Sequence, residues 1–176
     1  MKLAIREYWQ NLKTEYETTY KVSIFSDYNV LKEYIECFKT YLNGLLHEHP
    51  HDLNIVCALA TVEQVLRHEE NSIQLLEEFL RKYIEELSDT DKARVYTNLA
   101  FYYNDEGNIK EYDYLSAAVK LNSPYIETYR GLALYHFSAY REKDSVEELK
   151  ESLHAFEKGR TVSDGYEMNF GYAVCL

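Results

Sequence analysis

Proline and glycine are scarce in this chain, which has only two prolines and six glycines in 176 residues. Both residues interrupt helices, so their scarcity favours long helices over many short strands. No run approaches the roughly 18 consecutive apolar residues that a membrane span needs. The first apolar run contains the charged pair Arg6-Glu7, unlike the hydrophobic region of a signal peptide. We therefore expect a cytoplasmic protein with no membrane partner.

Positive charge is also in short supply. The chain has 30 aspartates and glutamates but only 19 lysines and arginines, which gives a formal net charge of −11. Because basic residues concentrate nowhere, a phosphate backbone would be repelled, and we expect no nucleic-acid partner. The three cysteines, Cys37, Cys57 and Cys175, are far apart and form no CxxC motif. This pattern predicts reduced thiols in a cytosol-like compartment, with Cys37 and Cys57 in the core.

Catalytic motifs are scarce as well: the chain has no GxSxG or GxGxxG motif and no phosphate-binding glycine loop. The sharpest candidate for chemistry is His47, His49 and His51 in "HEHPHD". Two of these imidazoles, with Asp52 or Glu48, would make three ligands for one metal ion. A second ligand pair at a set spacing is lacking, so a polar loop between helices is the favoured interpretation. We expect that the protein binds no metal or cofactor and is not an enzyme. A metal-dependent enzyme that uses this loop is the least favoured alternative.

Helical periodicity, in contrast, runs through almost the whole chain. Apolar residues recur every three or four positions in nine segments, which predicts an all-α protein with short connections. Helix-breaking and helix-capping residues separate the segments. The expected signals are Ser26-Asp27 before the second helix, Pro50 after it, Asp52 before the third, "HEENS" (68–72) after the third, "SDTD" (88–91) before a fifth helix from Ala93, Gly107 after the fifth, Ser123-Pro124 before the seventh, and Asp144 with Glu147 before the eighth.

Parts of these helices repeat. "YTNLAFYY" from Tyr96 aligns with "YRGLALYH" from Tyr129, which superposes Leu99 on Leu132 and Ala100 on Ala133. The same places are filled upstream by Val56, Leu59 and Ala60, and downstream by Phe170-Gly171. A period of roughly 33–40 residues with two helices per unit is typical of a helical solenoid. The alternative is an irregular helical bundle in which the similarity is accidental.

The repeated residues resemble the tetratricopeptide repeat. That family has a large aromatic residue, then leucine and a small residue three and four places on, then tyrosine; Tyr96, Leu99, Ala100 and Tyr103 fit this pattern. The glycine turn would be Gly107, and Ala118 and Pro124 match the end of the second helix. Departures include Val56 in place of the aromatic residue, Glu111 where the second helix has alanine, and a longer turn in "SAYREKD" (138–144).

The resemblance implies a right-handed solenoid of stacked antiparallel helix pairs in one all-helical domain. Its expected parts are an N-terminal helical extension or cap at 1–50, helix-pair repeats at 51–88, 89–122 and 123–162, and the start of a further repeat at 163–176. In such a repeat the small residue lets the paired helices approach closely.

The resemblance also implies a non-catalytic scaffold that binds a protein or peptide in a concave groove lined by the first helix of each unit. The groove positions would be Arg94, Thr97, Asn98, Phe101, Asn104, Glu127, Arg130, Leu134 and Phe137. Family members that hold acidic tails use a clamp of lysines, asparagines and an arginine, of which only Asn98 is matched here. Arg94 and Arg130 are the candidates for holding one peptide carboxylate. The alternative is the peptide-sensing module of a larger regulator.

The last predicted helix lacks the polar outer face with which solenoids usually end. Its sequence is "GYEMNFGYAVCL", from Gly165 to Leu176. We therefore expect self-association through this helix, most simply as a twofold homodimer.

Overall fold

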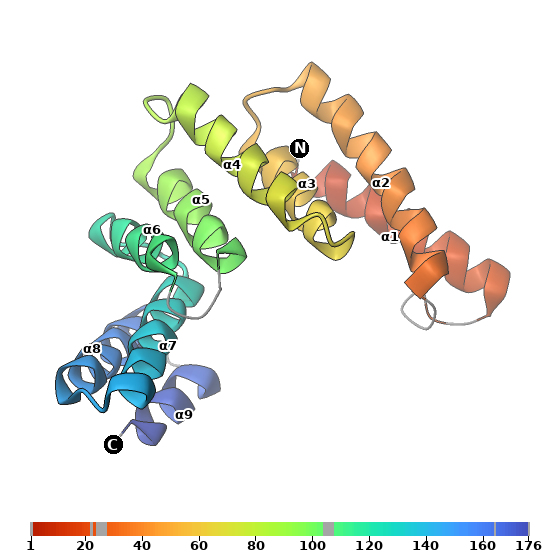
Figure 1. The fold of residues 1–176 in the computed structure, drawn as a ribbon. Coiled ribbons are helices and arrows are strands. Elements are labelled where there is room, and N and C mark those ends of the chain that lie inside the picture. Colours follow the sequence, from red (N-terminus) through yellow and green to blue (C-terminus); the bar gives the residue numbers. More distant parts are fainter. Residues whose placement is uncertain (1, 22, 24–27, 104–107, 164, 176) are drawn as a thin grey trace. The chain divides into compact units, whose positions relative to one another are not determined.

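A computed structural model describes residues 2–21, 23, 28–103, 108–163 and 165–175 (Figure 1). These residues form nine helices and no strand, so the all-α prediction is confirmed. The helices are α1 Lys2–Tyr20, α2 Tyr28–Glu48, α3 Leu53–Val65, α4 Glu69–Tyr83, α5 Asp89–Tyr102, α6 Ile109–Lys120, α7 Ile126–Lys143, α8 Val146–Val162 and α9 Tyr166–Val174.

Two of the predicted helix starts are made by side-chain caps. The Asp52 carboxylate accepts a hydrogen bond from the backbone N–H of Asn54 at the start of α3. Ser88 caps α5 in the same way, by accepting from the backbone N–H of Asp91. Helix α5 therefore begins at Asp89, earlier than the expected Ala93. Each cap satisfies a backbone donor that the first turn of a helix leaves without a partner.

Three expected boundaries were wrong. The "HEENS" stretch does not end α3; the break is at Arg67, which has a left-handed backbone (φ 63°), and Glu69 already begins α4. Ser123 does not cap α7, which has Tyr125 as its N-cap. Asp144 is the left-handed C-cap of α7 (φ 50°), and the neighbouring serine caps α8. In each case a turn residue was assigned to the wrong side of the turn.

Some predictions concern residues outside the described part of the chain. These are the Ser26-Asp27 cap, the groove residue Asn104 and the turn glycine Gly107. Among the cysteines, Cys57 is buried as expected, but Cys37 is exposed and does not belong to the core. All three cysteines are free thiols.

The chain divides into two compact units, residues 1–79 and 80–176. In the first unit, α2 packs against α1 and α3. The core of this unit consists of Ile5, Ile35, Phe38, Leu42, Ile55, Leu59, Val62 and Leu66. The partition into one domain with the repeat boundaries given above stays a prediction.

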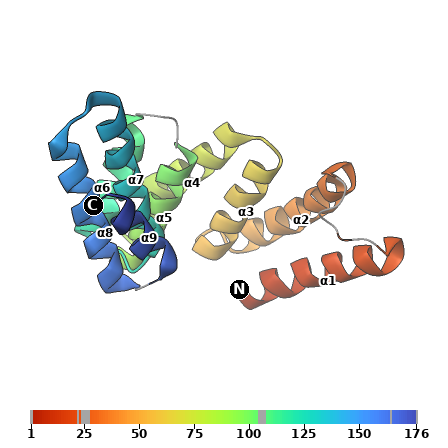
Figure 2. The same ribbon diagram turned by 90° about the horizontal axis from the view of Figure 1, so that it is seen from below.

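In the second unit, α5 pairs with α6 and α7 pairs with α8, while α9 packs against α8 (Figures 1 and 2). Its main core cluster consists of Tyr129, Ala133, Ala155, Phe156, Met168 and Cys175. Two glycines allow this packing. A Cβ added at Gly159 would lie 2.9 Å from Cβ of Tyr129, and one at Gly171 would lie 2.3 Å from the Phe156 ring. The backbones of α8 and α9 therefore approach neighbouring side chains more closely than any other residue would allow.

In two helix pairs, the first (α3 with α4) and the third (α7 with α8), a buried serine joins the two helices. Ser72 of α4 donates a hydrogen bond from Oγ to the carbonyl of Ala60 in α3, at 2.9 Å. Ser152 of α8 donates in the same way to the carbonyl of Ala133 in α7, at 2.8 Å. Both serines and both alanines have no exposed surface. The small residues of the repeat therefore leave room for a second helix to hydrogen-bond to the first.

Candidate functional site

Two hollows in the second unit adjoin each other, because Arg130 and Leu134 of α7 line both. The first, of about 230 Å³, lies among α5, α6 and α7 and has Glu111 in its wall. The second, of about 280 Å³, lies between α7 and α9 and has Phe170 in its wall. We call them the Glu111 hollow and the Phe170 hollow, and together they form the groove discussed below.

Most of the groove residues expected from the sequence line these hollows. The Glu111 hollow includes Thr97, Phe101, Glu127, Arg130 and Leu134, and the Phe170 hollow adds Phe137. Arg94 and Asn98 do not line either hollow. The hydroxyl of Thr97 is already engaged, since it donates to the carbonyl of Ala93 and lies 2.7 Å from Oγ1 of Thr128.

Large apolar side chains border the groove from three helices. Phe101 of α5 is 72% exposed, Leu134 of α7 is 48% exposed and Phe170 of α9 is 57% exposed. Tyr166 stacks on Phe170 with ring centroids 5.8 Å apart. Single exposed apolar residues are ordinary, but a contiguous group around a hollow is typical of an interaction surface. The sequence pattern indicated Phe101 and Leu134 as groove residues but did not indicate Phe170.

The arginine of the groove is engaged in an ion pair. A guanidinium nitrogen of Arg130 lies 3.0 Å from a carboxylate oxygen of Glu167 in α9. Both side chains are about half exposed or more, so the pair contributes at most about 1 kcal/mol. A ligand carboxylate would have to compete with Glu167 for this arginine.

Glu111 occupies the place of the bridging serines. The second helix of each pair (α4, α6 and α8) has a buried residue at a matching place: Leu76, Leu115 and Phe156. In α4 and α8 the residue four places before it is the bridging serine. In the second pair that residue is Glu111, which lines the hollow. The sequence signal was its departure from the repeat pattern, and its location in a hollow was not foreseen.

Burial raises the pKa of Glu111 from its ordinary value of 4.5 to about 7. Among the described residues, no side chain donates a hydrogen bond to its carboxyl group or forms an ion pair with it. A carboxyl group that loses hydration without gaining a hydrogen-bond donor is destabilised in its ionised form. This explains why the pKa of Glu111 is raised.

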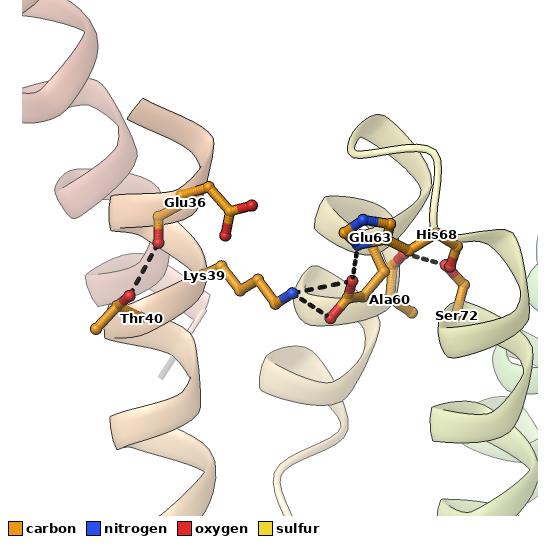
Figure 3. Close-up of polar contacts among 7 residues, drawn as sticks. All are labelled: Glu36, Lys39, Thr40, Ala60, Glu63, His68 and Ser72. Atoms are coloured by element: carbon orange, nitrogen blue, oxygen red, sulfur yellow. Dashed lines mark hydrogen bonds and ion pairs between the residues drawn. The ribbon is translucent and has the colours of Figure 1, made fainter. Parts of the chain in front are cut away.

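Glu63, in the first unit, shows the opposite arrangement (Figure 3). Nζ of Lys39 lies 3.0 and 3.2 Å from its two carboxylate oxygens, and Nδ1 of His68 lies 3.0 Å from one of them. Burial alone would raise the pKa of Glu63, but hydrogen bonds from Lys39 and His68 outweigh it and leave the pKa lowered. The same chain therefore contains one carboxylate with hydrogen-bond donors around it, including the cation of Lys39, and one half-buried carboxylate without them.

The remaining histidine candidates do not form a metal site with the other described residues. His47, His49 and His51 are all exposed, and within the described ranges no three potential ligands are close enough to hold a metal ion. His136 packs on Tyr112, and its Nδ1 lies 2.6 Å from a carboxylate oxygen of Glu148. In the part of the chain that the structure covers, every helix is too short or too polar to cross a membrane.

The chain resembles two crystal structures of MamA. One gives a TM-score of 0.57 at 19% sequence identity, with 82% of this chain and 78% of that chain covered. The other gives a TM-score of 0.53 at 17% identity, with 97% and 80% covered. The fold is a tetratricopeptide-like helical repeat. No family model and no curated protein matches the sequence.

Since both identities are low, the likeness to MamA establishes the fold alone. It confirms the all-helical repeat architecture that the residues around Tyr96 and Tyr129 indicated. A fold does not by itself determine a function, which depends on the residues of the site.

Proposed function

We propose that this protein is a non-catalytic scaffold that binds a protein or peptide along the groove formed by the Glu111 hollow and the Phe170 hollow. The observation that carries this proposal is the continuity of the two hollows through Arg130 and Leu134, with Phe101 and Phe170 exposed beside them. Exposed aromatic side chains next to a hollow are the usual anchors of a protein interface.

The chemistry of the lining supports binding over catalysis. Among the described residues that line the hollows there is no histidine, lysine or serine. A serine–histidine or cysteine–histidine pair, the commonest nucleophile–base arrangement, would need a histidine in this lining. The acidic residues of the groove also support a partner other than nucleic acid.

Site-specific photo-crosslinking in the native cell tests the proposal. A photoreactive p-benzoylphenylalanine at Leu134 would lie in the groove, and the same residue at Val146, which is also exposed, would lie on α8 outside the lining. We expect a defined partner to be crosslinked from position 134 and not from position 146. Mass spectrometry of the crosslink then gives the bound segment.

A synthetic peptide of that segment allows the contribution of the groove to be measured. Phe101→Ala should weaken its binding by about tenfold or more, which corresponds to about 1.4 kcal/mol, because an exposed anchor side chain is removed. Its thermal stability should change little, since the ring is mostly exposed. Equal crosslinking from both positions, or unchanged affinity of the variant, would place the interaction on another surface.

The alternative of a peptide-sensing module uses the same groove. A ligand in the Phe170 hollow would touch α9, which also reaches the core through Met168. Sensing therefore predicts that, when the crosslinked segment is added as a peptide, hydrogen exchange also changes along α8, which packs against α9 but contributes only Phe156 to the hollow. A scaffold without sensing predicts that only the groove-lining amides are affected.

We also propose that α9 mediates formation of a homodimer when no partner occupies the Phe170 hollow, so that dimer formation and partner binding compete. Tyr166, Phe170 and Val174 project from this helix with half or more of their surface exposed. Light scattering coupled to size exclusion should give twice the chain mass at tens of micromolar, and Phe170→Glu should give the monomer mass. A monomer at this concentration for the unaltered protein would exclude the dimer.

We also propose a cytoplasmic location, with which the free thiols of the three cysteines agree.

A further inference from the structure

The charges around the groove are unevenly matched. Three carboxylates, those of Glu111, Glu127 and Glu167, line the two hollows together with one cation, Arg130. Arg130 is paired with Glu167. Within the described part of the chain, Glu111 and Glu127 have no cationic partner. The Glu111 hollow therefore carries negative charge that the protein itself does not compensate.

Glu63 shows what a buried carboxylate of this fold gains from a cation. With Lys39 and His68 in contact, its charged form is favoured in spite of burial. Glu111 lacks such a contact, and its charged form is disfavoured. A positively charged group entering the Glu111 hollow would supply the missing partner at a site that is already partly desolvated, where charge-assisted hydrogen bonds are strong.

The size and walls of the hollow define the kind of group. At about 230 Å³ it is smaller than the roughly 300–1000 Å³ of pockets for drug-sized ligands, so it suits one side chain of a larger partner. Its apolar walls, from Ala100, Leu115 and Gly131, suit an aliphatic stem, and the Phe101 ring borders it. Lysine and arginine combine an aliphatic stem with a cationic end that also binds aromatic faces.

We propose that the Glu111 hollow receives a lysine or arginine side chain from a basic peptide segment of the partner, whose adjoining apolar residue occupies the Phe170 hollow. This inference rests on the proposed function of the groove and adds the charge of the ligand. The carboxylate of Glu111 accepts the hydrogen bond from the cationic end, and Glu127 adds long-range attraction. The net charge of −11 favours approach of a basic partner in general.

Proton release accompanies binding in this scheme. Among the described residues, the ionisable groups that face Glu111 are Glu127 and Arg130 of α7 in the hollow wall, and Tyr135 of α7, whose pKa is raised by burial and by neighbouring carboxylates including Glu111. A bound cation stabilises the ionised form of Glu111 and lowers its pKa, so part of the population loses a proton near pH 7.

Selection from a random peptide library tests the inference. A phage-displayed library of twelve-residue peptides is selected against the full 176-residue chain, against Glu111→Gln and against Glu147→Gln. The last variant makes the same chemical change at a side chain that is 82% exposed on α8. We expect peptides with a basic residue at one fixed distance from an apolar residue for the unaltered protein and for Glu147→Gln, and loss of the basic preference for Glu111→Gln.

Calorimetry on the best selected peptide then measures the effect. Replacing its basic residue with norleucine, and Glu111 with glutamine, should each weaken binding about tenfold. The two changes together should cost little more than either alone, because they remove the same interaction. Titrations at pH 7 in buffers of different ionisation enthalpy should show proton release that is absent with Glu111→Gln.

The outcomes separate the two proposals. If selected peptides are insensitive to Phe101→Ala and to Glu111→Gln, the groove is not the binding surface, and both proposals are overturned. If peptides bind in the groove but carry acidic residues, or retain their basic preference with Glu111→Gln, only the inference about Glu111 is overturned. A basic preference that depends on Glu111 supports both.

Discussion

The unpartnered carboxyl of Glu111 makes stability depend on pH in a defined way. In the unfolded chain its pKa is the ordinary 4.5, and in the folded protein it is about 7. Below pH 4.5 the group is protonated in both states, so its burial carries no charge penalty. Between pH 4.5 and about 7 the unfolded chain loses the proton while the folded protein retains it, and stability falls. Above about pH 7 the loss is complete.

The magnitude follows from the two pKa values. Their difference, from 4.5 to about 7, corresponds to at most about 3.5 kcal/mol at about 1.4 kcal/mol per pH unit. Since Glu111 is only half-buried, solvent screens the effect, and we expect about 1–2 kcal/mol. Glu111→Gln is neutral at every pH. The difference between the two proteins should therefore be smallest at pH 5 and largest at pH 8, where the variant is more stable by most of this screened amount.

Urea denaturation followed by far-ultraviolet circular dichroism at pH 5, 6, 7 and 8 measures this difference. Glu147→Gln, at the exposed position on α8, is the control and should differ from the unaltered protein by a constant small amount. Other titrating groups cancel because each variant is compared with the parent at the same pH. A difference between Glu111→Gln and the parent that stays the same from pH 5 to pH 8 would refute the assigned burial of this carboxyl.

Three further predictions concern packing. Ala100 is only 1% exposed, so Ala100→Leu should lower the free energy of unfolding by about 1–3 kcal/mol. Ala4→Leu, on the exposed face of α1, should change it by almost nothing. Equal urea midpoints for the two variants would show that the repeat register is wrong. Gly171→Ala should lower the melting temperature because its Cβ meets the ring of a buried phenylalanine, whereas Gly44→Ala, with nothing within 4 Å, should be neutral or stabilising; a stable Gly171→Ala would contradict the close approach of α9. Ser152→Ala should cost about 0.5–1.5 kcal/mol in chemical denaturation through loss of the hydrogen bond to α7, and no loss would show that this bond contributes nothing net.

The sequence was sufficient for features that depend on neighbours along the chain. Helical periodicity predicted nine helices, and local capping chemistry predicted Asp52 as a cap. The spacing of Ala100 and Ala133 predicted that both lie where helices approach closely, and both are buried. Each of these depends on a few adjacent residues and on the period of the helix. The boundary errors arose where two turn residues competed for one role, as at Asp144.

Only the tertiary structure decided the properties of the groove. The pairing of Arg130 with Glu167 joins residues on α7 and α9, and no local rule specifies which carboxylate reaches that arginine. The exposure of Phe170 depends on which face of α9 packs on α8 through Gly171. The sequence marked Glu111 as a departure from the repeat, but a pKa shift by desolvation depends on what three helices place around the carboxyl group. Those surroundings exist only once the helices are packed.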